Sequence, residues 1–125
     1  MGLLLDTHTL IWYAENSADL PARLVELIST TQVCYISRVT LWEVAIKVSI
    51  RKMEVEPNYT DWLQTMQQQF ELLEITNDHL TTLLTLPHHH RDPFDRLLIA
   101  QAIHEDLTLL SRDAHFTDYS VRVQW

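Results

Sequence analysis

The chain has 125 residues, of which 46% are hydrophobic, including four Trp, four Tyr and three Phe, and this composition predicts one folded domain over residues 1–125 and excludes a disordered chain. The net charge of −8 argues against a passive nucleic-acid binder, which normally carries a basic surface, but not against an enzyme whose acids hold a divalent metal. The single glycine excludes a P-loop and a dinucleotide-binding turn, since both need several glycines next to phosphate.

Apolar runs and helix signals then alternate along the chain. The apolar run at residues 2–6 predicts a strand that ends on Asp6, and helix-forming residues 7–14 follow at once. The other expected strands are residues 33–36, 71–75, 107–111 and 121–123. The other expected helices are residues 21–29, 39–50, 60–69, 77–86 and 92–105. Strands that alternate with helices predict an α/β fold with a parallel sheet covered by helices on both faces.

Two acids directly follow strands of this predicted sheet. Asp6 ends the first strand, and Asp113 comes shortly after the strand at residues 107–111. In an open α/β sheet, ligands bind outside the carboxyl ends of the strands. The alternatives are that Asp6 only caps the next helix and that Asp113 only forms a turn.

Glu43 lies in the helix that follows the second strand. Helical spacing places it on the same face as Val39 and Ile46, where a carboxylate is costly unless it is paired. It is therefore either a site residue or the partner of a cation one turn later, Lys47 or Arg51.

The last long helix opens with two acids, Asp92 and Asp95. Asp92 reads as the N-cap and Pro93 as the first helical residue, whereas Asp95 shares a face with apolar residues that should pack on the sheet. We predict that Asp95 is the site residue of the two, and the choice between them stays open.

Four carboxylates in one crevice repel one another unless cations are bound. Oxygen ligands without Cys or His suit Mg²⁺ or Mn²⁺ rather than zinc. Such ions, with water as the nucleophile, support hydrolysis of phosphodiesters.

The chain resembles the PIN-domain ribonucleases, and among them the VapC-like toxins of bacterial type II toxin–antitoxin pairs. The segments that carry the resemblance are residues 3–8, 41–44, 91–102 and 110–116. The resemblance implies a PIN-like fold with strand order 3-2-1-4-5. It also implies a Mg²⁺- or Mn²⁺-dependent endoribonuclease that leaves 5′-phosphate and 3′-hydroxyl ends, an antitoxin partner and a homodimer.

The family's four acids fall on Asp6, Glu43, Asp95 and Asp113, with Asp6 and Asp95 as the main metal ligands. Its hydroxyl falls on Thr7, which would hold a metal-bound water. Three residues, His90, Arg91 and Arg112, are candidate RNA contacts, because positive charge near the loop would offset the acidic surface locally. Arg96, next to Asp95, is expected to support the site, either by adding to this positive charge or by pairing with one of the acids.

Three other functions compete with this one. A phosphoacceptor signalling domain needs an Asp at the end of the third strand and a late Lys, and the chain has neither. A catalytically silent binding module is disfavoured by the intact acids, whereas a DNA nuclease or a housekeeping RNA-processing nuclease is not excluded by any residue.

The sequence also bears on the compartment. No apolar run approaches the ~18 residues that span a bilayer, and the first residues lack the features of a signal peptide. Cys34 has no partner for an internal disulfide. We therefore expect a cytoplasmic protein with no membrane segment.

Overall fold

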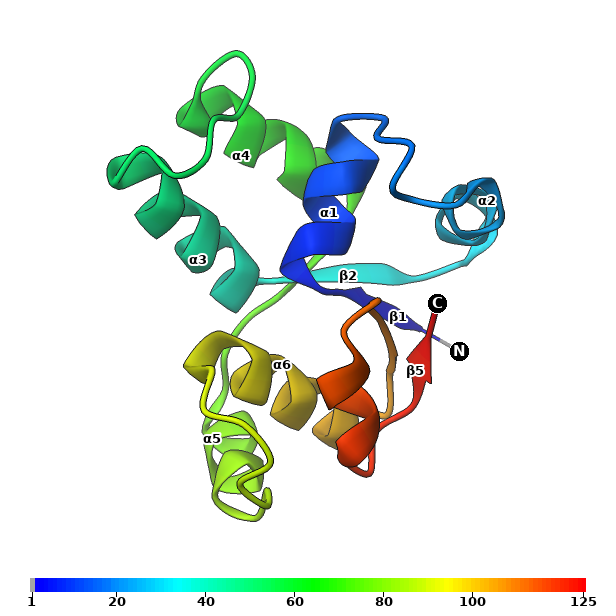
Figure 1. The fold of residues 1–125 in the computed structure, drawn as a ribbon, viewed down its shortest axis with the longest axis vertical. Helices are drawn as coiled ribbons and strands as arrows, with labels where there is room; N and C mark the ends of the chain where they lie inside the picture. Colours follow the sequence, from blue (N-terminus) through cyan, green and yellow to red (C-terminus); the bar gives the residue numbers. More distant parts are fainter. Residues whose placement is uncertain (1) are drawn as a thin grey trace.

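The computed structural model, which describes residues 2–125, is built on a five-stranded parallel sheet (Figure 1). The strands are β1 (Leu3–Leu5), β2 (Cys34–Ser37), β3 (Glu71–Leu73), β4 (Thr108–Leu110) and β5 (Val123–Gln124). They lie side by side in the order β3-β2-β1-β4-β5, and all four pairings are parallel. This confirms the predicted fold class and the strand order 3-2-1-4-5.

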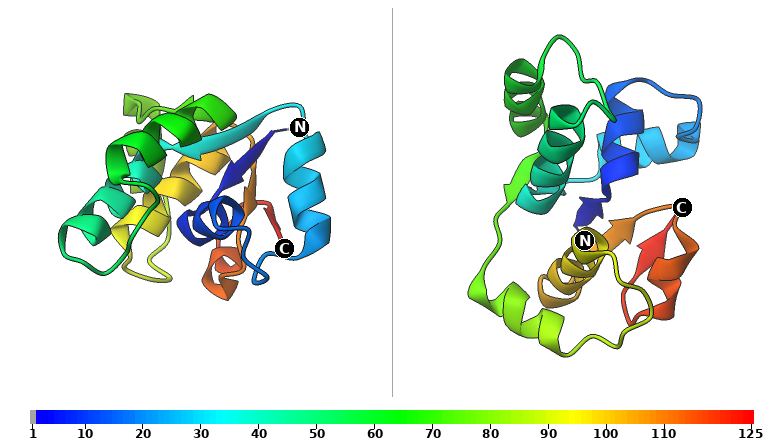
Figure 2. Two further views of the ribbon diagram at one scale, coloured as in Figure 1. Left: turned by 90° about the horizontal axis from the view of Figure 1, so that it is seen from above. Right: turned by 60° about the vertical axis from the view of Figure 1, so that its left-hand side comes forward.

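Helices cover both faces of the sheet (Figures 1 and 2). They are α1 (Thr7–Ala14), α2 (Ala22–Thr30), α3 (Arg38–Ser49), α4 (Tyr59–Gln69), α5 (Asn77–Leu84), α6 (Pro93–His104) and the 3₁₀-helix η1 (Ala114–Asp118). Helices α1, α2 and α4 pack on one face, and α5, α6 and η1 on the other. Helix α3 starts where β2 ends and packs against both α1 and α6, so it links the two layers at the carboxyl edge of the sheet.

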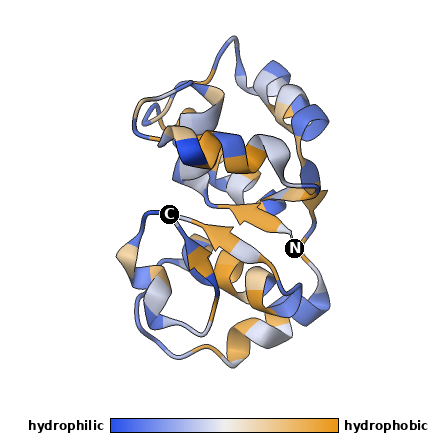
Figure 3. Cartoon of the chain, turned by 90° about the vertical axis from the view of Figure 1, so that its right-hand side faces the viewer, coloured by the Kyte–Doolittle hydropathy of each residue, from blue (hydrophilic) through white to orange (hydrophobic). Residues whose placement is uncertain are grey.

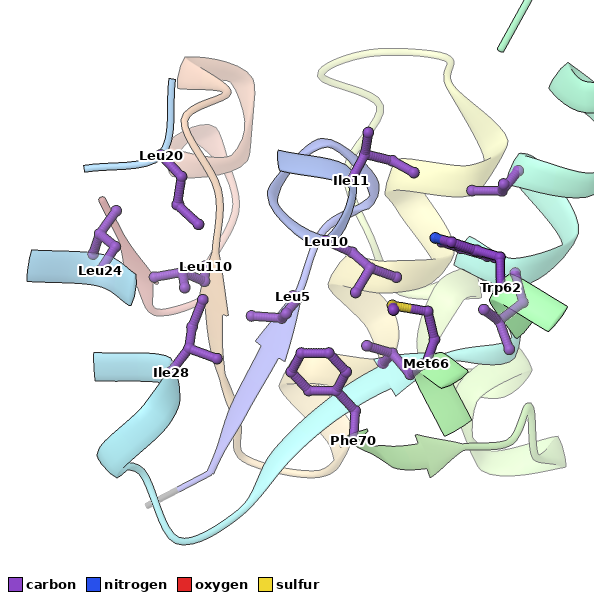
Figure 4. Packing of buried hydrophobic residues seen from close by; sticks show 13 residues of the cluster. Leu5, Leu10, Ile11, Leu20, Leu24, Ile28, Trp62, Met66, Phe70 and Leu110 are labelled. Carbon is purple, nitrogen blue, oxygen red and sulfur yellow. The ribbon is translucent and has the colours of Figure 1, made fainter. Parts of the chain in front are cut away.

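The two central strands divide the core into two clusters. Because side chains alternate along a strand, Leu5 and Leu110 face the α1, α2 and α4 side, while Leu4 and Leu109 face the α6 side. Figure 4 shows Leu5 and Leu110 among the side chains of the first cluster. Strands β1 and β4 are buried along their whole length, and apart from Thr108 they consist of leucines (Figure 3), as expected for strands that are covered on both faces.

Four of the five observed strands are shorter than the predicted ones, β2 has the predicted length but is shifted by one residue, and one short helix was not predicted. Leu107 and Ser111 flank β4 and are buried outside the strand itself, although the Ser111 N–H still donates to the Gln124 carbonyl oxygen of β5, so an apolar run overestimates the length of a strand. The 3₁₀-helix η1 is too short to give a periodic apolar pattern, and its only sequence signal is the capping residue Asp113.

Helix α5 ends at Leu84, two residues before the predicted end, because Thr85 and Leu86 turn the chain ahead of Pro87. Within residues 2–125, none of the helices has the length and apolar character that a membrane crossing requires.

Candidate active site

Asp6 is held at the carboxyl end of β1 by several hydrogen bonds. Its backbone N–H donates to the Leu110 carbonyl oxygen of β4 (3.2 Å), and its Oδ1 accepts from the Thr9 N–H (2.8 Å) at the start of α1. The Ser111 side chain also hydrogen-bonds to the Asp6 carboxyl. Asp6 is only 6% exposed, and burial raises its pKa despite these hydrogen bonds. Asp6 therefore caps a helix and is also a fixed, desolvated carboxyl at the sheet edge.

Asp113 lies near Asp6 through a residue that the sequence analysis did not single out, Ser111. The Asp113 N–H donates to Ser111 Oγ (3.0 Å), and the Ser111 side chain contacts Asp6. Asp113 Oδ1 accepts from the His115 N–H (2.9 Å) and caps η1. In the sequence, Ser111 is marked only by its place directly after a buried strand. Its position between Asp6 and Asp113 is seen in the fold.

Glu43 projects from the first half of α3 into a buried position between two donors. Its Oε1 accepts from the Thr7 hydroxyl (2.6 Å), and its Oε2 pairs with Lys47 Nζ (3.0 Å) one turn later. Glu43 is therefore paired with Lys47, the alternative considered from its sequence, and also contacts the predicted site residue Thr7. The Thr7 hydroxyl has one proton and donates it to Glu43, so this residue positions a carboxylate in the structure.

Asp95 is the point where the acids converge. It lies in the first turn of α6, half-buried, and its backbone N–H donates to the N-cap Asp92 (3.0 Å). Burial, the largest cause, and the negative charges of Asp92, Glu43, Asp113 and Asp6, in that order, together raise the pKa of the Asp95 carboxyl to about 7. Because charge interactions fall off with distance, all four sequence-predicted acids, together with Asp92, share one neighbourhood.

The donor chemistry of this neighbourhood fits a hydrated divalent cation. Within residues 2–125, no three His, Cys, Asp or Glu side chains are close enough to form a complete metal cluster. Mg²⁺, however, keeps several waters and is usually bound through only one or two carboxylates. A cation would also offset the burial and the neighbouring negative charges that together raise the pKa of Asp95 to about 7.

A pocket of about 290 Å³ opens beside two of the acids. It is lined by Asp6, His8, Trp12, Arg112 and Asp113. Of the three predicted RNA contacts, Arg112 is the one that lines this pocket. A larger hollow of about 960 Å³ lies elsewhere, along Gln67–Gln69 and neighbouring residues, and none of the acids lines it.

A predicted supporting residue, Arg96, and a predicted RNA contact, His90, have partners outside the site. The prediction that Arg96 pairs with a site acid is wrong, because its Nη1 donates to the Pro87 carbonyl oxygen (2.7 Å) and to the Tyr119 hydroxyl (3.2 Å). His90, a predicted RNA contact, places its Nδ1 3.2 Å from the same hydroxyl and packs its ring against Tyr119. Both side chains therefore fasten the loop that leads into α6, while Arg91 in that loop is exposed.

The Thr7–Glu43 hydrogen bond gives a first testable expectation. Thr7→Val keeps the shape of the side chain but removes the donor to a buried carboxylate, so we expect it to lower the free energy of unfolding by about 1–2 kcal/mol. Thr7→Ser keeps the hydroxyl and should cost less than about 0.8 kcal/mol, the value of one buried methyl group. Urea unfolding of the three proteins measures both differences, and equal losses for the two variants would show that the hydrogen bond does not stabilise the fold.

Comparison with known proteins places this arrangement in context. The family model for the PIN domain matches residues 3–121. Among curated proteins, Ribonuclease VapC22 of Mycobacterium tuberculosis is 24% identical over 112 residues, a match that covers 89% of this chain and 86% of that protein.

Solved structures with the same fold come from several bacteria. VapBC2 from Rickettsia felis, bound to a DNA fragment from its promoter, matches with a TM-score of 0.77 and 17% identity over 99% of this chain and 98% of the other. FitAcB from Neisseria gonorrhoeae matches with a TM-score of 0.70 and 18% identity over 97% and 95% of the two chains. At these identities the structural likeness establishes the fold.

Proposed function

The chain belongs to the PIN domain family, and we propose that it is a divalent-metal-dependent endoribonuclease that acts as the toxin of a toxin–antitoxin pair. Its substrate would be RNA, cut by water to leave 5′-phosphate and 3′-hydroxyl ends. The relative VapC22 is a ribonuclease, which supports the nuclease part of this proposal.

The observation that carries the proposal is the convergence of acids on Asp95. Five carboxylates from the end of β1, α3, the start of α6 and the loop after β4 lie close enough that four of them add to the effect of burial and raise the pKa of the fifth, Asp95, to about 7. A fold gains nothing in stability from such repulsion. The arrangement is therefore best explained by a cation that the acids bind during function.

The residues at this edge of the sheet would have different roles. Asp6 and Asp95 would hold the ion directly, and Glu43 and Asp113 would complete the site or bind its waters. When bound, Mg²⁺ or Mn²⁺ supplies charge neutralisation at the phosphate and activation of water. Thr7 and Lys47 hold the Glu43 carboxylate in position, and Ser111 links the positions of Asp6 and Asp113.

Positive charge near the acids would bring the RNA backbone to an otherwise acidic protein. Arg112 lines the pocket beside Asp6 and Asp113, and Arg91 is exposed in the loop that leads to Asp92. These two guanidinium groups can bind phosphate beside the acids.

The toxin assignment rests on the structural relatives. Several of them are complexes of the VapBC kind, and one is described as a toxin–antitoxin complex from Klebsiella pneumoniae. We propose by analogy that this chain is inhibited by an antitoxin protein, forms a homodimer and acts in the cytoplasm.

Cleavage of defined oligonucleotides tests the proposal. The purified protein in Mg²⁺ should cut single-stranded RNA internally, should leave ends that a 5′-phosphate-dependent exonuclease degrades, and should leave DNA of the same sequence intact. Cutting of the DNA alone would replace the ribonuclease by a deoxyribonuclease, and no cutting of either would leave the silent binding module as the better explanation. Growth arrest on expression, relieved by a small protein encoded next to the gene, would separate a toxin from a housekeeping nuclease.

A further inference from the structure

Three flat side chains form one wall of the pocket beside the acids. The rings of His8 and Trp12, one turn apart on α1, are stacked with centroids 5.8 Å apart and planes at 25°. The Arg112 guanidinium, which follows β4, lies over the Trp12 ring, 4.9 Å from its centroid. Asp6 and Asp113 complete the lining. We call His8, Trp12 and Arg112 the stacking wall.

The fold does not explain why Arg112 takes this position. Two carboxylates line the same pocket, yet within residues 2–125 no carboxylate lies within 4.0 Å of the Arg112 guanidinium nitrogens. The guanidinium instead covers an aromatic face, where Arg can both stack and attract negative charge. His8 and Arg112 are exposed, so both can contact a molecule that enters from solvent.

The size and shape of the pocket limit what can enter. A volume of about 290 Å³ is at the lower end of the range for ligand pockets, about 300–1,000 Å³, so it suits one planar ring system. The exposed His8 imidazole and Arg112 guanidinium, both packed against the Trp12 ring, offer planar faces for stacking, which is how proteins bind unpaired bases of single-stranded nucleic acids. The pocket also touches Asp6 and Asp113, so whatever binds there lies next to the acids of the site.

We propose that this pocket receives the unpaired base of a nucleotide adjoining the phosphate that is cut, and that the stacking wall binds its face. This inference rests on the proposed ribonuclease function and makes that function more specific, because it assigns one base of the substrate to a position beside the acids. A base in a duplex is stacked and paired and is not available to the wall. Stacking accepts all four bases, so the wall favours unpaired structure more than any particular sequence.

Single-turnover cleavage of a labelled single-stranded RNA of about 12 nucleotides tests this assignment. With protein in excess over RNA in Mg²⁺, the protein concentration at half-maximal rate reports binding and the maximal rate reports chemistry. Trp12→Leu should raise the half-saturating concentration about fivefold to a hundredfold, with a much smaller change in the maximal rate. Trp12→Phe keeps an aromatic face and should recover most of the loss. The matched control is Trp42→Leu, an exposed Trp on α3 that does not line the pocket and should change binding less than about twofold.

A substrate with one abasic nucleotide identifies the base that occupies the pocket. For the wild-type protein, removing one particular base beside the cut should weaken binding by the same factor as Trp12→Leu. In the Trp12→Leu protein the same abasic substitution should have no further effect, because the stacking partner is already absent. Because Trp12 also contacts Trp125, the exposed His8→Ala variant provides the same test without altering the packed interior.

The outcomes separate this inference from the function on which it rests. If the wild-type protein cuts no RNA, the ribonuclease proposal itself fails. The wild-type protein can also cut RNA while the loss of binding in Trp12→Leu or His8→Ala multiplies with the loss caused by the abasic nucleotide, wherever in the RNA that nucleotide is placed. In that case the base does not bind the stacking wall. An equal loss in Trp42→Leu, or equally tight binding of a perfect duplex, would overturn the assignment as well.

Discussion

Asp6→Asn and Asp95→Asn are each expected to slow RNA cleavage by about 10²- to 10⁴-fold, since a metal ion contributes several kcal/mol of charge stabilisation in the transition state. Both substitutions keep the size of the side chain and remove its charge. Asparagine also caps helices well, so Asp6→Asn should preserve the start of α1. Cleavage rates in saturating Mg²⁺, measured with circular dichroism to verify folding, give the result.

Asp92→Asn is the matched control for Asp95→Asn. Asp92 is exposed, caps α6 and lies three residues away, so its replacement by Asn keeps the cap and alters the charge near Asp95. We expect a loss of less than about tenfold, the lower end of what an outer-shell residue contributes. A loss in Asp92→Asn as large as in Asp6→Asn, with an active Asp95→Asn protein, would mean that Asp92 is the metal ligand. Full activity in Asp6→Asn would remove the four-acid mechanism altogether.

Residues at the ends of strands were the most predictable part of the site. Asp6 and Asp113 follow apolar strands, and parallel strands bring their carboxyl ends to one edge of the sheet. Asp95 was distinguished from Asp92 because only Asp95 shares a face with the buried residues of α6, and the structure has Asp95 half-buried and Asp92 exposed. For these residues the local pattern along the chain and the position in the fold follow the same rule, so the sequence is enough to predict where each side chain lies.

Contacts between side chains of distant segments were much less predictable. Arg96 is next to Asp95 in sequence, yet it reaches Pro87 and Tyr119, because the helix turns its side chain away from the acids. The stacking wall joins α1 to the loop after β4, and neither segment has a motif that marks the contact. Ser111 is similar, since its role depends on Asp6 and Asp113 lying on either side of it in space. Such contacts depend on rotamers and on the register of β1 against β4, and no pattern along the chain records these.

The raised pKa of Asp95, caused first by burial and then by the neighbouring acids, also predicts how stability depends on pH when no divalent metal is present. The native pKa of Asp95 is about 7, whereas the unfolded value is 3.8, so between these pH values the native state keeps a proton that the unfolded chain has lost. Stability must therefore fall as pH rises from about 4 to about 7, and then stay level as far as this group is concerned. The shift corresponds to roughly 4 kcal/mol, which solvent screening of a half-exposed group reduces to about 1–2 kcal/mol.

Divalent metal should reverse this loss at high pH. At pH 8, Mn²⁺ or Mg²⁺ at a hundred times its Kd should stabilise the protein by about 2.7 kcal/mol, because it binds the native acids and not the unfolded chain. For a chain of this size we expect Tm to rise by roughly 3–5 °C per kcal/mol.

Asp95→Asn removes the charge, so its Tm in EDTA should exceed that of the wild type at pH 8 and match it near pH 4, and its response to Mn²⁺ should be smaller. Asp92→Asn, which keeps Asp95, should retain the response. Thermal melting of the three proteins at pH 4, 6 and 8, in EDTA and in Mn²⁺, measures all of these shifts. If the wild-type and Asp95→Asn curves stay parallel across pH and neither responds to Mn²⁺, the acids neither repel one another nor bind metal.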